Sequence, residues 1–543
     1  MRSRASSRAL LLLVLAVGAA LRVWGLQFGF PHPAARPDEE VLVDAALGVL
    51  RDGNPRFFDW PSAFIYTTAG SYAALFALER AVGGAIRHAA IAKAAFQPVL
   101  HLIPRALSAA AGVLTIAALY GAARELFSRR IALLAAVFLS VAFLHVRDSH
   151  FGVTDVPATF LTVCAFWAAL RCATRGPTDA RVALAGALCG LGASTKYNAA
   201  LVLLPAIAAI AQPAEGRPAP PPASAARSIA LLAACAAAAF LLGTPFAVLD
   251  HRTFLTSVAA VRSHLAGGHV IMTRGWPYHA AFTLRYGLGI PLVAAACAGA
   301  VWLAVERPRA ALLVLAFPIP YYVYLGSGQT VFVRYLVPMV PFVCLAAAYF
   351  VDRAGAFAAP RFHAAIARDV VIAGLAVIVC APTLRASVLF DRLMAAEDTR
   401  VAGANWIASR FPMGASMYQS GFGAGHLQPA PLGFYPQYGF NERAGGFEID
   451  HHPADAPPDV IVLLESPLGP YSIVPPRIAS IVADDYVLAA AIDSVPADRA
   501  AEALYDREDA FFAPFAGIEH AVRPGPNVRI FVRRSASSGT PSR

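Results

Sequence analysis

Long apolar runs separated by short polar links fill most of the first 390 residues of this chain. A helix needs about 20 residues to cross the roughly 30 Å of hydrocarbon in a bilayer. The runs predict about 11 transmembrane helices, near residues 9–27, 103–126, 131–146, 154–172, 181–195, 198–212, 228–248, 286–304, 309–326, 335–351 and 370–389. The pattern therefore predicts a polytopic α-helical membrane protein.

The first apolar run follows a basic start, an arrangement that also occurs in signal peptides. It continues through Leu21, Val23 and Trp24 with no small-residue cleavage site, so we predict an uncleaved first span with a cytoplasmic N-terminus. Basic residues in cytoplasmic links set the orientation of membrane proteins. With this orientation, arginine occurs in every link expected inside: Ser128–Arg130, Thr174–Arg181, Gln212–Arg227, Glu306–Arg309 and Asp352–Arg368.

The first outer loop, residues 28–102, contains an apolar segment, 61–83, that is closed by Glu79 and Arg80. A segment that is apolar on much of its circumference but ends in charges is typical of an interfacial helix, here on the outer surface. An odd number of spans then places everything after about residue 389 outside the cytoplasm.

The pattern changes in the last part of the chain. Asp398–Phe411 has the periodicity of an amphipathic helix, and Ala415–Gln419 and Asp459–Glu465 are short apolar segments that suit strands. We therefore predict two domains: a transmembrane domain over 1–390 and a soluble, extracytoplasmic α/β domain over 391–543.

Composition supports this assignment and excludes other classes. The chain is 58% hydrophobic and 14% charged, against about 25% charged in soluble domains. Its net charge of +10 lies mostly in the short links, so orientation explains it and nucleic acid is not expected as a partner. All seven cysteines lie in or beside apolar runs without a CxxC pair, which excludes a zinc knuckle or a disulfide framework.

The first candidate for chemistry is an acidic motif, Pro37-Asp38-Glu39-Glu40, shortly after the first span. A carboxylate at a membrane surface can act as a general base toward an acceptor hydroxyl or amine. Asp38 and Glu39 are also possible ligands of a divalent metal ion. The alternative is structural: Asp38 as the N-cap of a helix, with acids in its first turn.

Ionisable residues also gather where the apolar runs end on the predicted outer side. Such residues are costly in a membrane and usually mark a site. Asp155 has a structural alternative as a helix N-cap, and Lys196 as a side chain that extends to the lipid headgroups. Arg334 opens a span, where the helix dipole disfavours it, so we assign it to phosphate binding. The group comprises Arg147, His150, Asp155, Lys196, Tyr197 and Arg334.

The outer loop 250–285 mixes cationic and aromatic side chains, among them His264, Arg274 and Trp276. This mixture suits an amphipathic ligand, and equally a plain loop in the headgroup layer.

The order and spacing of these motifs resemble the glycosyltransferase C (GT-C) superfamily, in its protein O-mannosyltransferase and aminoarabinose transferase branch. The acidic motif, Asp59-Trp60-Pro61, Pro104-Arg105, the Lys196-Tyr197 turn and Val333-Arg334-Tyr335 carry the resemblance. One position departs from it: many relatives have a basic residue before the proline of the first loop, where this chain has Trp60 preceded by Asp59. That departure leaves the donor sugar open, aminoarabinose especially.

The resemblance implies an inverting transferase that moves one sugar from a polyprenyl-phosphate donor to an extracytoplasmic lipid, glycan or protein acceptor, in the plasma (inner) membrane of a bacterium. It implies that Asp38 is the base, that Glu39 positions the acceptor or a divalent cation, and that Asp155 lines the same cavity. Phosphate-binding roles fall to Arg105, Lys196 and Arg334, and the cavity would also involve Arg147, His150, Tyr197, His264 and Arg274.

Two other functions fit parts of the pattern. A transporter or flippase for a lipid-linked sugar would use the same cations for binding, but transporters often have internal repeats and none is found. An inactive anchor that carries a partner-binding domain would not need the Asp38–Glu39 pair.

Overall fold

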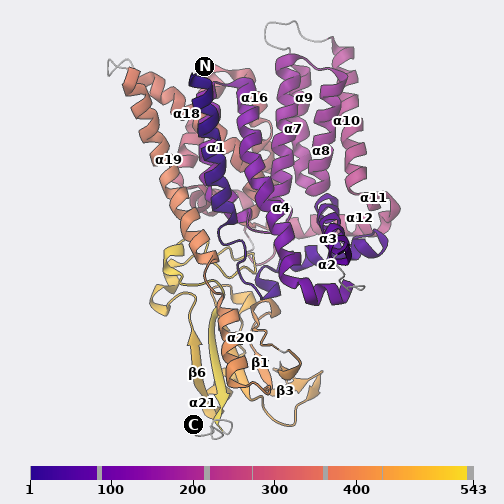
Figure 1. The fold of residues 1–543 in the computed structure, drawn as a ribbon, viewed down its shortest axis with the longest axis vertical. Coiled ribbons are helices and arrows are strands. Elements are labelled where there is room, and N and C mark those ends of the chain that lie inside the picture. The colour runs from indigo at the N-terminus through magenta and orange to yellow at the C-terminus, as the bar shows by residue number, and fades with distance from the viewer. Residues whose placement is uncertain are drawn as a thin grey trace. The chain divides into compact units, whose positions relative to one another are not determined.

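The computed structural model describes residues 2–81, 89–212, 221–271, 273–358, 365–430 and 432–534 (Figure 1). The chain divides into two compact units: unit 1 holds Met1–Leu26 and Val41–Val388, and unit 2 holds Gln27–Glu40 and Leu389–Arg543. Unit 2 thus includes the segment 27–40, which the sequence-based division assigned to the first domain. Parts of the predicted links at 212–227 and 352–368, and the end of segment 61–83, lie outside the described residues.

Unit 1 consists of helices, of which α2 begins and α19 ends in unit 2. They are α1 (Arg2–Val23), α2 (Pro37–Asp52), α3 (Ala63–Ala81), α4 (Ala89–Leu126), α5 (Arg129–Val141), α6 (Phe143–Asp148), α7 (Asp155–Arg175), α8 (Asp179–Thr195), η2 (Tyr197–Val202), α9 (Leu203–Ala211), α10 (Pro222–Gly243), α11 (Phe246–Leu249), α12 (His251–Gly267), α13 (Gly275–Tyr278), the π-helical η3 (His279–Leu284), α14 (Arg285–Leu288), α15 (Ile290–Glu306), α16 (Pro308–Leu315), α17 (Pro318–Gly326), η4 (Val333–Met339), α18 (Val340–Ala358) and α19 (Ala365–Met394).

Within the described residues, five helical segments are long and apolar enough to cross a membrane, or up to seven if each of two bent pairs counts as one span. The bends measure 112° between α14 and α15 and 40° between α16 and α17. This confirms a polytopic helical architecture. The count is lower than the predicted 11 because several predicted spans are shorter helices, such as α5 with 13 residues and α8 with 17.

Close helix packing in unit 1 depends on glycines. Helices α7, α8 and α10 lie side by side in Figure 1, and α8 packs closely on α10. A Cβ atom added at Gly190 would lie 2.1 Å from the carbonyl oxygen of Ala236 on α10. A Cβ at Gly299 on α15 would lie 1.9 Å from the carbonyl oxygen of Ala346 on α18. Small residues at such crossings let helix backbones approach in a membrane, where packing drives association.

A break at Ala142 separates α5 from α6 and leaves backbone carbonyl groups without helical partners. The fully buried guanidinium of Arg22, on α1, donates to the carbonyl oxygens of Leu139 (3.1 Å) and Ser140 (3.0 Å) and contacts Nδ1 of His145 (2.9 Å). On the other side, the N–H of Phe143 donates to the hydroxyl of Thr383 at 2.7 Å. The break is therefore stabilised by polar groups from α1 and α19, as irregular backbone at membrane depth requires.

Replacing Arg22 with methionine is expected to lower the free energy of unfolding by roughly 3 kcal/mol, because buried carbonyl groups lose their donors. Thermal unfolding of the detergent-solubilised protein measures this effect. The control is Arg51→Met, which removes an exposed arginine at the end of α2. Equal unfolding midpoints for the two variants would show that Arg22 does not stabilise the break at Ala142.

Unit 2 contains a sheet of seven strands in the order β4-β3-β2-β1-β5-β7-β6. Strands β1 and β2, and β1 and β5, pair in parallel, and the other pairs are antiparallel. The predicted helix and both predicted strands are present, as α20, β1 and β5, which confirms the α/β class. The elements are α20 (Thr399–Arg410), β1 (Met417–Gln419), β2 (Gln437–Asn441), β3 (Gly446–Ile449), β4 (His452–Pro453), β5 (Val460–Glu465), α21 (Pro476–Asp485), β6 (Tyr486–Ile492) and β7 (Asn527–Arg533).

Helix α20 covers one face of the central strands, and its buried residue Ile407 shares a core with Val462 of β5 and Ile530 of β7. Asp398 caps the helix by accepting a hydrogen bond from the backbone N–H of Arg400. Local sequence is therefore sufficient to start the helix, and burial of its apolar face attaches it to the sheet.

The segment Gln27–Glu40 belongs to unit 2 through specific side-chain contacts. His32 Nε2 lies 2.7 Å from the carbonyl oxygen of His426. The ring of Phe28 meets that of Phe511 edge to face, with centroids 5.7 Å apart. These contacts explain the difference from the sequence-based division, because pairing between residues so distant along the chain leaves no local pattern.

The stability of unit 2 is expected to fall as the pH drops from about 6.5 toward 4. Burial, and secondarily the charge of Arg400, lower the pKa of His32 from 6.5 to about 4, although Asp398, Glu40 and the hydrogen bond to His426 act in the opposite direction. In that window the unfolded chain binds a proton at His32 that the folded chain excludes. The stabilisation is therefore complete above pH 6.5 and is lost as the pH falls.

Unfolding midpoints of wild type and His32→Gln, recorded between pH 7.5 and 4.5, test this expectation. His32→Gln is expected to show a weaker dependence on pH, whereas His452→Gln, which replaces an exposed histidine in the same unit, is expected to behave as wild type. Identical slopes for wild type and His32→Gln would contradict the assignment.

Candidate active site

The acidic motif forms the first turn of α2. The helix begins at Pro37, so Asp38 lies inside the first turn and the alternative that makes it the N-cap is wrong. Acids at this position are favoured by the helix dipole. The Asp38 side chain is 28% exposed, whereas Glu39 is fully buried.

The buried guanidinium of Arg36 connects the motif to a second carboxylate. Its Nη2 lies 3.4 Å from Oδ2 of Asp38, and its Nη1 donates to Oδ1 of Asp509. The guanidinium also lies 5.6 Å from the ring centroid of Phe511. All of these residues belong to unit 2. Asp38 is thus an accessible carboxylate held on one side by a buried cation.

Metal binding at the motif is not supported by a cluster of ligands. In the part of the chain that the structure describes, no group of three or more His, Cys, Asp or Glu side chains is arranged to hold a metal ion. Asp38 and Glu39 alone provide two carboxylates, and Arg36 already faces Asp38. We therefore assign no chemical step to a metal.

In unit 1, the structure pairs two of the predicted residues. Asp155 is the first residue of α7, and Lys196 directly follows α8. Thr154 occupies the N-cap position of α7, so N-capping does not account for Asp155. The ammonium group of Lys196 forms an ion pair with Oδ1 of Asp155, and the two side chains are 12% and 3% exposed. Each charge compensates the other in a site with little water.

Aromatic rings in and next to η4 lie close to Lys196 and Arg334. The Lys196 ammonium lies 5.2 Å from the ring centroid of Tyr335, and the Arg334 guanidinium lies 4.0 Å from that of Phe332. The hydroxyl of Tyr321 on α17 donates to the carbonyl oxygen of Tyr335 at 2.9 Å. Cation–π contacts at these distances stabilise a positive charge that has little access to water. The predicted phosphate-binding residues Lys196 and Arg334 therefore contact neighbouring rings, those of Tyr335 and Phe332, whose centroids are 5.3 Å apart.

The loop after α12 joins the same segment. The ring of His269 stacks on Phe332 with centroids 5.8 Å apart, and His264 contacts His269 edge to face at 5.3 Å. The structure thus links His264, a predicted cavity residue, to Arg334 through two intervening rings. Arg274, predicted for the same cavity, lies exposed immediately before α13.

Tyr197 connects this region to the first outer loop. Its hydroxyl donates to the carbonyl oxygen of Phe58 at 2.8 Å, and its ring contacts Phe254 on α12. Asp59, the next residue in the loop, interacts electrostatically with His264. Partial desolvation raises the pKa of Asp59, and His264 opposes this shift.

A separate set of buried polar residues surrounds the end of α1. His150 contacts the carbonyl oxygens of Val146 at 3.0 Å and Trp24 at 2.9 Å, and Arg105 donates to that of Leu26 at 2.9 Å. Arg147 forms an ion pair with the adjacent Asp148 at 3.1 Å. Arg105, Arg147 and His150 are almost completely buried. The contacts of His150 and Arg105 hold the segment that follows α1. The substrate roles predicted for the three residues stay predictions.

A family model for dolichyl-phosphate-mannose-protein mannosyltransferase matches residues 102–239, which contain Arg105, Asp155 and Lys196. The chain is also similar to ArnT from Cupriavidus metallidurans in the apo state, with 15% identity, a TM-score of 0.54, and coverage of 99% of this chain and 100% of ArnT. The match to ArnT bound to undecaprenyl phosphate has 14% identity and a TM-score of 0.54, and covers 98% of this chain and 99% of ArnT. At such identities the likeness shows a common fold. The chain has the GT-C fold.

The chain is also similar to the Archaeoglobus fulgidus oligosaccharyltransferase tethered with an acceptor peptide that contains the NVT sequon. That match has 14% identity and a TM-score of 0.51, and covers 75% of this chain but only 57% of the oligosaccharyltransferase. Among curated proteins there is no match. The comparisons confirm the predicted fold class, and the family model matches the part of the chain from 102 to 239.

Sequence analysis assigned no site role to three residues that interact with the candidate residues. Arg36 and Asp509 form an ion pair in unit 2, and Asp59 interacts electrostatically with His264 in unit 1. The sequence contains a signal for Arg36, since a cation directly before an acidic motif is available to pair with it, and for Asp59, which belongs to the Asp59-Trp60-Pro61 motif. Asp509 lies 473 residues away from Arg36, and nothing in its local sequence points to the motif.

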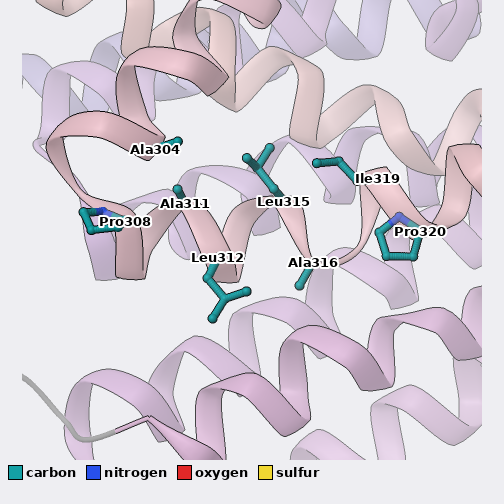
Figure 2. Close-up of a pocket in the computed structure, with 8 residues that line it drawn as sticks. All are labelled: Ala304, Pro308, Ala311, Leu312, Leu315, Ala316, Ile319 and Pro320. Carbon is teal, nitrogen blue, oxygen red and sulfur yellow. The ribbon is translucent and has the colours of Figure 1, made fainter.

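A pocket of about 420 Å³ in unit 1 lies apart from these residues, between the end of α15, α16 and α17 (Figure 2). Its lining is entirely apolar and consists of Ala304, Pro308, Ala311, Leu312, Leu315, Ala316, Ile319 and Pro320. No lining residue can exchange a proton or bind phosphate, so we do not assign the chemistry to this pocket.

Proposed function

We propose that this protein is a membrane glycosyltransferase that moves one monosaccharide from a polyprenyl-phosphate donor to an extracytoplasmic acceptor. The observation that carries the proposal is the match of the mannosyltransferase family model to residues 102–239. The donor class is supported by a structure of similar fold, since ArnT has been solved with undecaprenyl phosphate. A peptide is one possible acceptor, since the oligosaccharyltransferase has been solved with an acceptor peptide.

In the proposed reaction, an acceptor oxygen or nitrogen attacks the anomeric carbon of the donor sugar from the face opposite the phosphate. The bond between that carbon and the phosphate oxygen breaks, so polyprenyl phosphate leaves and the anomeric configuration inverts. Asp38 takes the proton of the acceptor as general base. Its partial exposure supports this role, whereas the buried Glu39 would position the acceptor group or a divalent cation from beneath.

Fixed cations in unit 1 would stabilise the negative charge that grows on the departing phosphate. Lys196 and Arg334 are supported for this role because they contact Tyr335 and Phe332, two rings that lie against each other with centroids 5.3 Å apart. Asp155 would keep Lys196 in place. Arg105 is the weaker candidate, because its guanidinium already donates to the carbonyl oxygen of Leu26.

The remaining predicted residues would line the space for donor and acceptor. Tyr197 and His264 are supported by their contacts with the first outer loop. His150 would act indirectly, by holding the segment after α1, and Arg147 through its ion pair with Asp148. The exposed Arg274 would contact lipid headgroups or the donor phosphate.

We further propose that the protein lies in the bacterial plasma membrane with its N-terminus in the cytoplasm and unit 2 outside. The arginines of the links expected inside support this orientation. Cysteine-accessibility labelling of single-cysteine variants in the 174–181 link and in unit 2 tests it. Labelling of unit 2 from the cytoplasmic side would overturn it.

Purified protein in vesicles, incubated with radiolabelled undecaprenyl-phosphate sugars and membrane extract, tests the function. We expect the label to leave the polyprenyl phosphate and to appear on an acceptor, which identifies donor and acceptor together. Labelled sugar lipid that crosses the bilayer without covalent transfer would instead favour a flippase and overturn the proposal.

A further inference from the structure

The loop that contains Asp509 is buried in unit 2 and held there by hydrogen bonds. The N–H of Asp509 donates to the carbonyl oxygen of Asp506 at 3.2 Å, which closes a turn, and the hydroxyl of Tyr471 donates to the carbonyl oxygen of Glu508 at 3.2 Å. Asp506, Glu508 and Asp509 are all buried. A carboxylate on such a turn has a fixed position, so it can fix the position of a partner.

Arg36 lies between two carboxylates that differ in exposure. Asp509 is 6% exposed and accepts the close hydrogen bond from Nη1, whereas Asp38 is 28% exposed and lies 3.4 Å from Nη2. The Arg36 side chain itself is fully buried. A buried guanidinium needs compensation by a negative charge, and Asp509 provides it without contact with solvent. The accessible carboxylate, Asp38, is then left with the longer contact.

We propose that Asp509 is a positioning residue for the general base Asp38, and that it acts through Arg36. This inference rests on the proposed function. By holding the guanidinium, Asp509 keeps Arg36 from closing fully onto Asp38, so the Asp38 carboxylate stays oriented yet able to accept a proton. Unit 2 then has a direct part in the reaction, because its residue Asp509 adjusts the reactivity of Asp38.

The charge balance predicts what happens without Asp509. In Asp509→Asn, the buried guanidinium loses its close anionic partner and moves onto Asp38. A carboxylate paired more tightly with a cation favours its charged form and becomes a weaker base. Misplacement of a catalytic group by about 1 Å can cost on the order of 100-fold in rate. We expect kcat to fall about 10- to 100-fold, and the acid limb of the pH–rate profile to move to lower pH.

The experiment measures kcat, KM for the donor and the pH–rate profile of the full-length protein in vesicles with an undecaprenyl-phosphate sugar. Asp509→Asn is compared with Asp509→Glu, which restores the charge and is expected to recover most of the rate. The control is Glu502→Gln, which removes one exposed negative charge from unit 2 and is expected to leave kcat and the profile unchanged. KM for the donor is expected to stay constant throughout.

A purely structural role of Asp509 would give a different result. It would lower the yield of folded protein and reduce the rate in proportion, without any shift of the pH–rate profile, and that outcome overturns the inference. If Asp509→Asn does not fold, Arg36→Lys decides: the shorter cation changes both contacts, and an unchanged pH–rate profile in that variant also overturns the inference.

Failure of the proposed function is recognised separately. If Asp38→Asn is active, Asp38 is not the general base. If the wild-type protein transfers no sugar, the proposed function is wrong. Both conclusions hold whatever Asp509→Asn shows. If Asp38→Asn is inactive while Asp509→Asn has the rate and pH–rate profile of wild type, only the role of Asp509 is wrong.

Discussion

Replacing Asp38 with asparagine is expected to abolish sugar transfer, with a fall in kcat of about 10²- to 10⁴-fold. Asparagine has nearly the same shape but cannot take the proton of the attacking acceptor. The side chain also keeps an oxygen that can face Arg36, so the first turn of α2 is expected to stay folded. Binding of the donor lipid, measured by equilibrium binding of a labelled undecaprenyl-phosphate sugar, is expected to be unchanged.

The matched control for this prediction is Asp44→Asn, which changes an exposed carboxylate on the same helix. It is expected to retain wild-type kcat. Transfer at the wild-type rate by Asp38→Asn would exclude Asp38 as the general base. Loss of donor binding together with activity would mean that Asp38 supports the structure and not the proton transfer.

Replacing Lys196 with methionine is expected to lower the free energy of unfolding by about 3–5 kcal/mol, because it leaves the buried carboxylate of Asp155 without its cation. The double variant, Asp155→Asn with Lys196→Met, removes both charges. Its stability is expected to return close to that of wild type, since an uncharged pair needs no compensation. Thermal unfolding in detergent measures both effects.

Activity separates the structural from the functional role of the pair. If Lys196 stabilises the departing phosphate, the double variant is expected to be folded and still inactive, with weakened binding of undecaprenyl phosphate. A folded and fully active double variant would restrict Lys196 to a structural role. The control is Arg227→Met, which breaks an exposed ion pair with Asp179 and is expected to change stability by less than about 1 kcal/mol.

The sequence revealed the residues of the Asp155–Lys196 site but not their pairing. Asp155 and Lys196 were each recognised as ionisable residues at the ends of apolar runs, but their pairing was not, because they lie 41 residues apart on different helices. The N-cap alternative for Asp155 was local and reasonable, and it failed because Thr154 holds that position. Side-chain pairing across helices depends on how α7 and α8 pack, and no periodicity encodes that packing.

In the described residues, fewer helices than the predicted 11 spans are long and apolar enough to cross a membrane, for a related reason. Apolar runs of about 15 residues have the composition of transmembrane helices, but whether such a run crosses as one straight helix depends on breaks. The break at Ala142 is stabilised by Arg22 from α1, and the 112° bend after α14 joins two short helices. Hydropathy depends only on composition, so it could not predict the break at Ala142 or the bend after α14.

By itself, the sequence determined the polytopic helical class, the α/β domain after residue 390 and the acidic motif at Asp38, because run length, periodicity and residue type are local properties. The tertiary structure alone decided that Gln27–Glu40 belongs with unit 2 and that Asp509 lies beside Arg36. Arg36 and Asp509 are 473 positions apart, so they meet only when the chain has folded. Once both are buried, each charge compensates the loss of water around the other.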